Sequence, residues 1–271
     1  MIERVRESLQ SQLNLFYLAL SFFTRLPVPK TMHYSDLLLN KANRYFSLVG
    51  ILIGGILGVF YSGFSPFVPA NIAILLIMVL SLLLTGAFHE DGLADMADGM
   101  GGGFTKEKKL SIMKDSRIGT YGAVTLVMAF LLKYALLVEL STLNSNHLLI
   151  AIVLAESLSR AVAGSLISTM PYVSDSDLSK SKPLAQAQSL SELALLLLVG
   201  LMPLIFYPSQ VILSLLLVLI AFRYFFKHWL MAKIGGFTGD CLGAAQQISQ
   251  LLIYITLVAS LNKVTVSGVL G

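Results

Sequence analysis

The sequence predicts an all-α, polytopic integral membrane bundle of about seven transmembrane helices, with an N-terminal interfacial or re-entrant segment. Of its 271 residues, 56% are hydrophobic and 13% are charged, and the mean hydropathy is +0.79. A soluble domain carries about 25% charged residues, so this composition excludes a soluble enzyme and a disordered chain. A single cysteine, Cys241, excludes an internal disulfide framework. We expect one membrane-embedded domain over residues 1–271.

Seven stretches approach the roughly 20 apolar residues that a spanning helix needs. Short links near residues 65–70, 144–147 and 208 predict helical hairpins. By contrast, residues 13–24 cover only about 18 Å as a helix, too little to cross the bilayer. We therefore expect that segment to lie at the interface or to insert halfway. The predicted spans are 45–64, 71–88, 120–143, 147–170, 190–207, 209–226 and 244–261.

Basic residues indicate the orientation, because cytoplasmic loops of membrane proteins are rich in Lys and Arg. If the N-terminus is cytoplasmic, fifteen of the nineteen Lys and Arg residues fall in cytoplasmic segments. Only Lys263 falls on the opposite side, and Lys133, Arg160 and Arg223 fall within spans. The net charge of +4 therefore suits basic loops beside anionic lipid better than nucleic-acid binding.

Three aspartates follow the second predicted span at i, i+4 and i+7: Asp91, Asp95 and Asp98. On a helix they lie within about 60° of one another. Like charges at this spacing repel, so a divalent cation is expected beside them, and hard carboxylate oxygens favour Mg²⁺ or Mn²⁺ over zinc. The alternative is a helix end whose acids face water. Gly101, Gly102 and Gly103 should end this helix.

A mixed-charge segment, residues 114–122, precedes the third span. Lys114 and Arg117 are candidates for phosphate oxygens, and Asp115 for the metal site or for pairing with a neighbouring base. The spacing leaves these alternatives open. Upstream, residues 106–109 can equally lie as a basic helix on anionic lipid.

A glycine-rich turn opens the last span on the same predicted side. Gly236, Thr238 and Gly239 can expose backbone N–H groups to an anion, and Asp240 can ligate metal or complement the helix dipole. Three glutamines, Gln246, Gln247 and Gln250, continue the polar face into the span.

Inside the spans, Glu156 and Arg160 are spaced i, i+4, which suggests an ion pair that is structural or supports the polar site. Lys133 and Arg223 can snorkel towards an interface. His89 is either a base or a hydrogen-bonded neighbour.

Clustered aspartates with basic and glycine-rich segments at one membrane face suggest Mg²⁺-assisted attack on a phosphate ester or anhydride. Phosphoalcohol transfer, prenyl transfer and pyrophosphate hydrolysis all fit. An ion-coupled transporter fits less well, because it needs acids near the midplane and discontinuous helices. A prenyltransferase would carry a second, denser acidic motif than Asp240 alone provides.

The order of four motifs resembles the cobalamin synthase family over about residues 15–250: residues 22–29, 91–99, 113–122 and 236–240. Residues 114–122, which read KDSRIGTYG, are the most specific of the four. Glu90 and Met96 stand where that family often has other residues, and neither change removes an aspartate.

The resemblance implies a Mg²⁺-dependent membrane transferase that joins α-ribazole, or its 5′-phosphate, to adenosylcobinamide-GDP and releases GMP. It implies a bacterial cytoplasmic membrane with the active site on the cytoplasmic face, and it is compatible with a homo-oligomer and with other cobalamin-assembly enzymes as partners. The resemblance also implies three sets of site residues. Mg²⁺ would be bound by Asp91, Asp95, Asp98 and Asp240. Phosphate would be held by Lys114, Arg117, the 236–239 turn and Arg25, and the base is left open among Asp98, Asp115 and His89.

Overall fold

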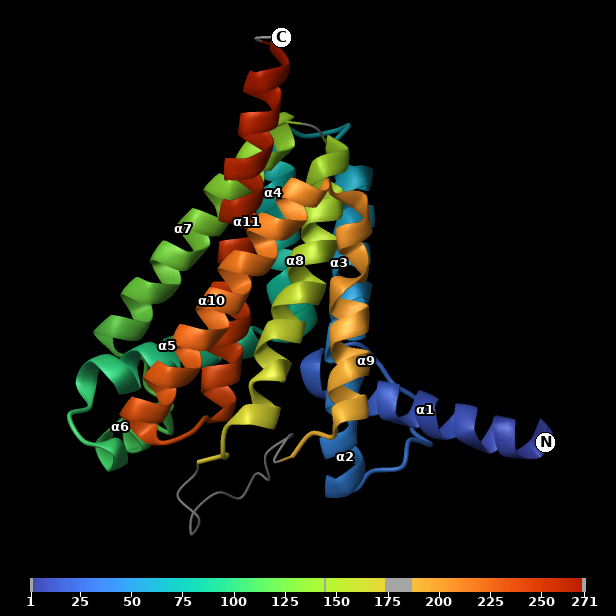
Figure 1. The fold of residues 1–271 in the computed structure, drawn as a ribbon, viewed down its shortest axis with the longest axis vertical. Coiled ribbons are helices and arrows are strands. Elements are labelled where there is room, and N and C mark those ends of the chain that lie inside the picture. Colours follow the sequence, from blue (N-terminus) through green and yellow to red (C-terminus); the bar gives the residue numbers. More distant parts are fainter. Residues whose placement is uncertain (1, 144, 174–186, 270–271) are drawn as a thin grey trace.

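The computed structural model describes residues 2–143, 145–173 and 187–269, and regular structure in these ranges is helical apart from one isolated β-bridge (Figure 1). In chain order the elements are α1 (Ile2–Phe23), α2 (Asp36–Ala42), η1 (Asn43–Tyr45), α3 (Phe46–Phe64), α4 (Ala70–Thr85), α5 (Phe88–Gly102), α6 (Lys106–Met113), α7 (Thr120–Leu143), α8 (Ser145–Ser165), η2 (Ile167–Thr169), α9 (Leu190–Leu201), η3 (Met202–Phe206), α10 (Ser209–Ile234) and α11 (Gly239–Val269).

Five helices of the described chain are long and apolar enough to cross a membrane: α3 together with α2 and η1, α7, α8, α10 and α11. A sixth span arises if α4 and α5 are counted together as one broken span. The predicted fold class, a polytopic helical membrane bundle, is therefore confirmed, and the protein is a multi-pass membrane protein. The other two predicted spans are shorter than expected.

The predicted span 71–88 is wrong at its end, because the helix stops at Thr85 and the chain turns by 86° into α5. Gly86 and Ala87 both adopt left-handed backbone angles, with φ of 64° and 56°. This conformation is easy for glycine and costly for alanine. As a result α5 runs crosswise to the long helices near one end of the bundle (Figure 1). The predicted span 190–207 also falls short, since α9 has 12 residues and continues as η3.

Two further boundaries bear on the predicted polar side. The tenth helix extends to Ile234, so Lys227 and Lys233 lie on α10 rather than in the predicted loop 227–243. The first helix, α1, is not among the described helices that are long and apolar enough to cross a membrane. It lies crosswise at the same end of the bundle as α2, α5 and α6 (Figure 1). The crosswise course of α1 agrees with the expected interfacial segment (Figure 1). Lys180 and Lys182 lie outside the described residues.

The centre of the bundle is α8, which packs against α3, α9 and α11. In its most apolar stretch 89% of residues are buried, compared with 17% in α7 and 22% in α10, so these two helices offer most of their surface to lipid. Close packing of α3 on α8 depends on glycine. A Cβ added at Gly50 would lie 2.3 Å from the carbonyl oxygen of Glu156, and one at Gly54 would lie 2.7 Å from the Cα of Val153.

We predict that Gly50→Ala separates α3 from α8 and lowers the free energy of unfolding by about 1–3 kcal/mol, the usual cost of overpacking. Thermal unfolding of the purified protein in detergent measures the effect. Gly55→Ala is the matched control, because a Cβ at Gly55, on the same helix, meets nothing within 4 Å. Equal midpoints for the two variants would contradict this account of the α3–α8 contact.

Candidate functional site

Four aspartates gather where α5 crosses the start of α11, and we call them the acidic face: Asp91, Asp95, Asp98 and Asp240. The two helices approach closely, since a Cβ at Gly92 would lie 3.0 Å from the Cα of Asp240. Asp91 is exposed, Asp95 is partly buried and Asp98 is buried. The i, i+4, i+7 spacing therefore places its carboxylates at increasing depth along one stripe of α5, and the fold brings Asp240 beside them.

Burial and mutual repulsion both act on the carboxylates of the acidic face. Partial burial, followed by the charges of Asp91, Asp240 and Asp98, raises the pKa of Asp95 to about 7. Within the described ranges, no three His, Cys, Asp or Glu side chains converge closely enough to hold a metal ion. The four side chains of the acidic face offer carboxylate oxygens as donors. Such a set fits Mg²⁺, which is usually held by one or two carboxylates and keeps waters or substrate phosphates in its other positions.

Asp98 also has a structural partner, the start of α7. Its carboxylate accepts hydrogen bonds from the backbone N–H groups of Gly119, at 2.7 Å, and Gly122, at 2.8 Å. A Cβ at either glycine would lie 2.4 Å from an Asp98 oxygen, so only glycine admits this approach. Asp98 therefore caps α7 with a negative charge, which the helix dipole favours.

In the mixed-charge segment 114–122, Asp115 pairs with a neighbouring base, which is one of the two alternatives that the spacing left open. Arg117 grips Asp115 with Nε at 3.0 Å from Oδ1 and a terminal nitrogen at 2.6 Å from Oδ2. This pairing lowers the pKa of Asp115 to about 2. The Arg117 side chain is 86% exposed and stays accessible to an anion. Lys114 is also exposed and caps the end of α6.

The basic stretch 106–109 is split by its fold. Lys109 is buried and donates a hydrogen bond to the carbonyl of Phe104 at 3.1 Å, so it does not face lipid. Lys106 and Lys108 are exposed.

The glycine-rich turn is braced rather than open along its whole length. Phe237 pairs with Tyr172 in the isolated parallel bridge, and a Cβ at Gly236 would lie 2.2 Å from the carbonyl oxygen of Pro171. The hydroxyl of Thr238 accepts from the Cys241 backbone N–H at 3.3 Å and so caps α11. A Cβ at Gly239 meets nothing within 4 Å, so the backbone of this residue is the part of the turn that a ligand can approach.

Arg25 and His89 occupy opposite environments near the bend. Arg25 is exposed, and its guanidinium lies against Gly86, since a Cβ there would be 2.4 Å from Nε. His89 is buried and stacks with Phe23 and Phe46 at centroid distances of 6.2 and 5.6 Å. Arg25 therefore faces the surface beside α5, whereas His89 points into the core and does not join the acidic face.

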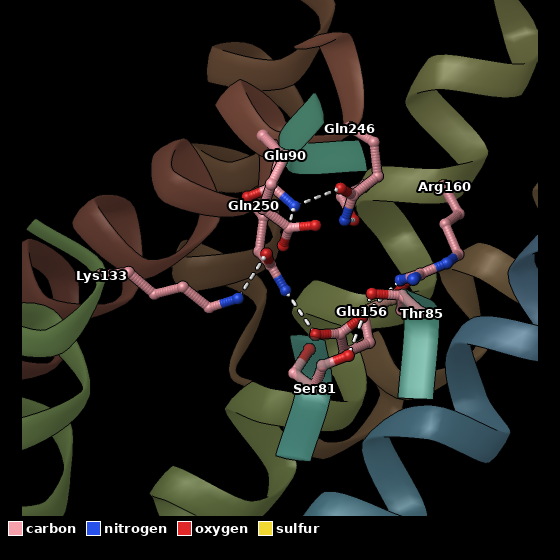
Figure 2. Close-up of polar contacts among 10 residues, drawn as sticks. Ser81, Thr85, Glu90, Lys133, Glu156, Arg160, Gln246 and Gln250 are labelled. Atoms are coloured by element: carbon pink, nitrogen blue, oxygen red, sulfur yellow. Dashed lines mark hydrogen bonds and ion pairs between the residues drawn. The ribbon is translucent and has the colours of Figure 1, made fainter. Parts of the chain in front are cut away.

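A buried polar network lies further inside the bundle than the acidic face (Figure 2). Arg160 pairs with Glu156, four residues earlier on α8. The other oxygen of Glu156 accepts from Gln250 at 2.7 Å, and Gln250 accepts from Lys133 at 3.0 Å. The pair expected from the i, i+4 spacing is present. Lys133, expected to snorkel, is instead buried and bonded across to α11. Arg223 is partly buried and bonds to Ser165 at 2.7 Å, at the end of α8.

A second branch of the network reaches α5. Gln247 donates to Glu90 at 2.9 Å and to Gln246 at 2.9 Å, and Gln246 donates to Ser159 at 3.0 Å. Glu90 was not among the predicted site residues. Three amide side chains inside an apolar span were the available signal, because buried amides need polar partners on other helices.

Comparisons with known proteins agree with one another. Residues 15–258 match the family described as cobalamin-5-phosphate synthase. Proteins named adenosylcobinamide-GDP ribazoletransferase are similar to this chain in Vibrio vulnificus strain YJ016 (58% identity, 92% of this chain and 97% of the relative), Vibrio cholerae strain O395 (55%, 94% and 97%) and Shewanella pealeana (52%, 92% and 96%). No solved structure matches the chain.

We predict that Asp98→Ala lowers the free energy of unfolding by about 1–2 kcal/mol, because two N–H groups at the start of α7 lose their acceptor. Thermal unfolding in detergent checks this. Asp91→Ala, on the same helix and exposed, is the control and should cost less than half as much. Equal losses would contradict the capping role.

We predict that Asp95→Asn raises the midpoint of thermal unfolding at pH 8 in buffer with a chelator. The ionised carboxylate suffers burial and repulsion in the folded state, and the amide does not. Added Mg²⁺ should raise the midpoint of the wild type more than that of the variant. A lower midpoint for Asp95→Asn without metal would show that the repulsion is already compensated.

Proposed function

The chain belongs to the cobalamin-5-phosphate synthase family, and from this premise we propose that it is an adenosylcobinamide-GDP ribazoletransferase. It transfers the phosphocobinamide moiety of adenosylcobinamide-GDP to α-ribazole or its 5′-phosphate. The products are adenosylcobalamin, or its phosphate, and GMP. The reaction belongs to the last steps of cobalamin nucleotide-loop assembly.

The acidic face is the proposed metal site, where the carboxylates of Asp91, Asp95 and Asp240 would hold Mg²⁺. The supporting observation is that burial and then the crowding of negative charge raise the pKa of Asp95 to about 7. Bound Mg²⁺ would neutralise this charge and stabilise the charge that develops on the phosphate oxygens. Hard oxygen donors without a cysteine or histidine suit this ion.

Cationic and backbone groups at the same end of the bundle are the proposed diphosphate ligands. Exposed Arg25, Lys114 and Arg117 can supply positive charge, and Arg117 can fork onto two oxygens as it now does with Asp115. Gly239 at the start of α11 offers an open backbone approach beside Asp240. These groups would bind the diphosphate of the substrate, so that the GMP leaving group points away from the acceptor hydroxyl.

The proposed step is a displacement at the phosphorus that carries cobinamide. A ribose hydroxyl of α-ribazole forms the new P–O bond, the P–O bond to GMP breaks with its electron pair leaving on GMP, and the hydroxyl gives up its proton. Of the three residues left open as the base, Asp98 alone lies on the acidic face. A carboxylate has about four lone-pair sites, and two N–H groups occupy two of them, so Asp98 retains room to accept that proton.

The single observation that carries the proposal is the meeting of the α5 aspartates with Asp240, from motifs about 150 residues apart, at the bundle end where α1, α2 and α6 also lie (Figure 1). The excess of Lys and Arg in the segments at this end supports a cytoplasmic location for it in a bacterial inner membrane.

The proposal predicts GMP release from adenosylcobinamide-GDP that requires both α-ribazole and Mg²⁺. The measurement uses the purified chain in detergent or in membranes, with GMP and the corrinoid product quantified together. Release that ignores α-ribazole would point to a hydrolase, and absence of release from folded protein would overturn the proposed function.

In the same assay Asp91→Asn and Asp95→Asn should each lower kcat by at least about 10-fold, because oxygen donors to the metal are weakened. Asp36→Asn, at the same end of the bundle but outside the acidic face, is the control and should keep wild-type activity. Full activity in both α5 variants would remove them from the metal site.

A further inference from the structure

One stripe of α11 joins the acidic face to the buried network: Asp240, Gly243, Gln247 and Gln250, spaced 3, 4 and 3 residues apart. Such spacing keeps all four on one side of a helix. Along this stripe the contacts pass from α5 to the interior of the bundle. Asp240 and Gly243 touch Gly92 of α5, Gln247 bonds to Glu90, and Gln250 bonds to Glu156 and Lys133.

The α5–α11 contact is smooth where the two glycines meet. A Cβ at Gly92 would lie 3.3 Å from the Cα of Gly243, and one at Gly243 would lie 3.2 Å from the carbonyl oxygen of His89. Glycines allow close approach but provide no side chain that could interlock and prevent sliding. The register of α5 on α11 is therefore set by contacts between the side chains that lie beside the glycines.

Glu90 makes such a contact. It is 5% exposed, and its Oε1 accepts from Gln247, which is 6% exposed. A hydrogen bond to a buried carboxylate is stronger than one between neutral groups, and breaking it strands a buried acceptor. Gln247 also donates to Gln246, and Gln246 donates to Ser159 of α8. Glu90 is thereby tied to the central helix of the bundle.

We propose that Glu90 and Gln247 are positioning residues that set the register of α5 against α11, so that Asp91 and Asp95 face Asp240. Glu90 directly precedes Asp91, so their side chains point about 100° apart: one is buried in the bundle and the other is exposed. Movement of Glu90 would turn or shift Asp91 with it. Neither residue contacts substrate in this proposal, which rests on the proposed function for its consequence in catalysis.

The test is a swap of the bonded pair, Glu90 and Gln247. Electron paramagnetic resonance measures the binding of Mn²⁺ alone, and a second assay measures the rate of GMP release as a function of Mg²⁺ concentration. Gln247→Glu places a carboxylate against Glu90 and should weaken Mn²⁺ binding and lower kcat by about 10-fold or more, as losses of groups that support metal ligands do. KM for adenosylcobinamide-GDP should stay within about 2-fold, because the cationic groups are untouched.

The double variant Glu90→Gln with Gln247→Glu restores one carboxylate and one amide in reversed positions. It should recover Mn²⁺ affinity and kcat to within about 3-fold of the wild type. Gln246 can turn its amide to suit, since the Ser159 hydroxyl donates as well as accepts. Ser249→Ala is the matched control: Ser249 is buried on the same helix, its hydroxyl has no partner among the described residues, and its loss should change neither readout.

A double variant as defective as Gln247→Glu alone, when both melt as folded proteins, would overturn the positioning role. So would a single variant that raises KM and leaves Mn²⁺ binding intact, since Glu90 or Gln247 would then act on substrate. If the wild type binds Mn²⁺ but releases no GMP, the proposed function fails, and the Mn²⁺ series alone still decides the positioning role. Rescue of Mn²⁺ affinity by the double variant supports it in either case.

Discussion

A bilayer interior has no water for a charged side chain, so each ion buried in this bundle needs a polar partner within the protein. Glu156 meets Arg160 on its own helix and Gln250 on α11, and Gln250 also holds Lys133 of α7. These bonds link α7, α8 and α11 and fix the rotation of each helix about its own axis. Because α11 cannot turn without breaking them, Asp240, on the same stripe of α11, is held towards α5.

Small residues decide how closely the polar elements approach. The turn at Gly86 and Ala87 swings α5 by 86° from α4, so that it crosses the start of α11 instead of continuing through the membrane. Gly92 and Gly243 then let the two helices come within contact of their backbones. Gly119 and Gly122 do the same for Asp98 and the start of α7. The acidic face thus depends on positions with no side chain as much as on its carboxylates.

Local spacing predicted much of this arrangement. The i, i+4, i+7 pattern placed three aspartates on one stripe of a helix, and the side of the membrane assigned from basic residues brought Asp240 to the same end. Spacing did not separate the uses of neighbouring acids. Asp115 is paired with Arg117, and His89 packs beside the stacked rings of Phe23 and Phe46 in the core, because each outcome depends on which neighbour the fold presents. The bend was not predicted either, since alanine at position 87 gives no signal of a left-handed backbone.

The sequence by itself determined the membrane class, most spanning segments and the family, because these follow from hydropathy summed over about 20 residues and from continuous motifs. Tertiary structure alone decided the crosswise course of α5, the pairing of Lys133 with α11 and the bond between Glu90 and Gln247. The two bonds join residues more than 100 positions apart. Their free energy arises only when distant groups are buried together, and no local pattern of residues records which partner each buried polar group will find.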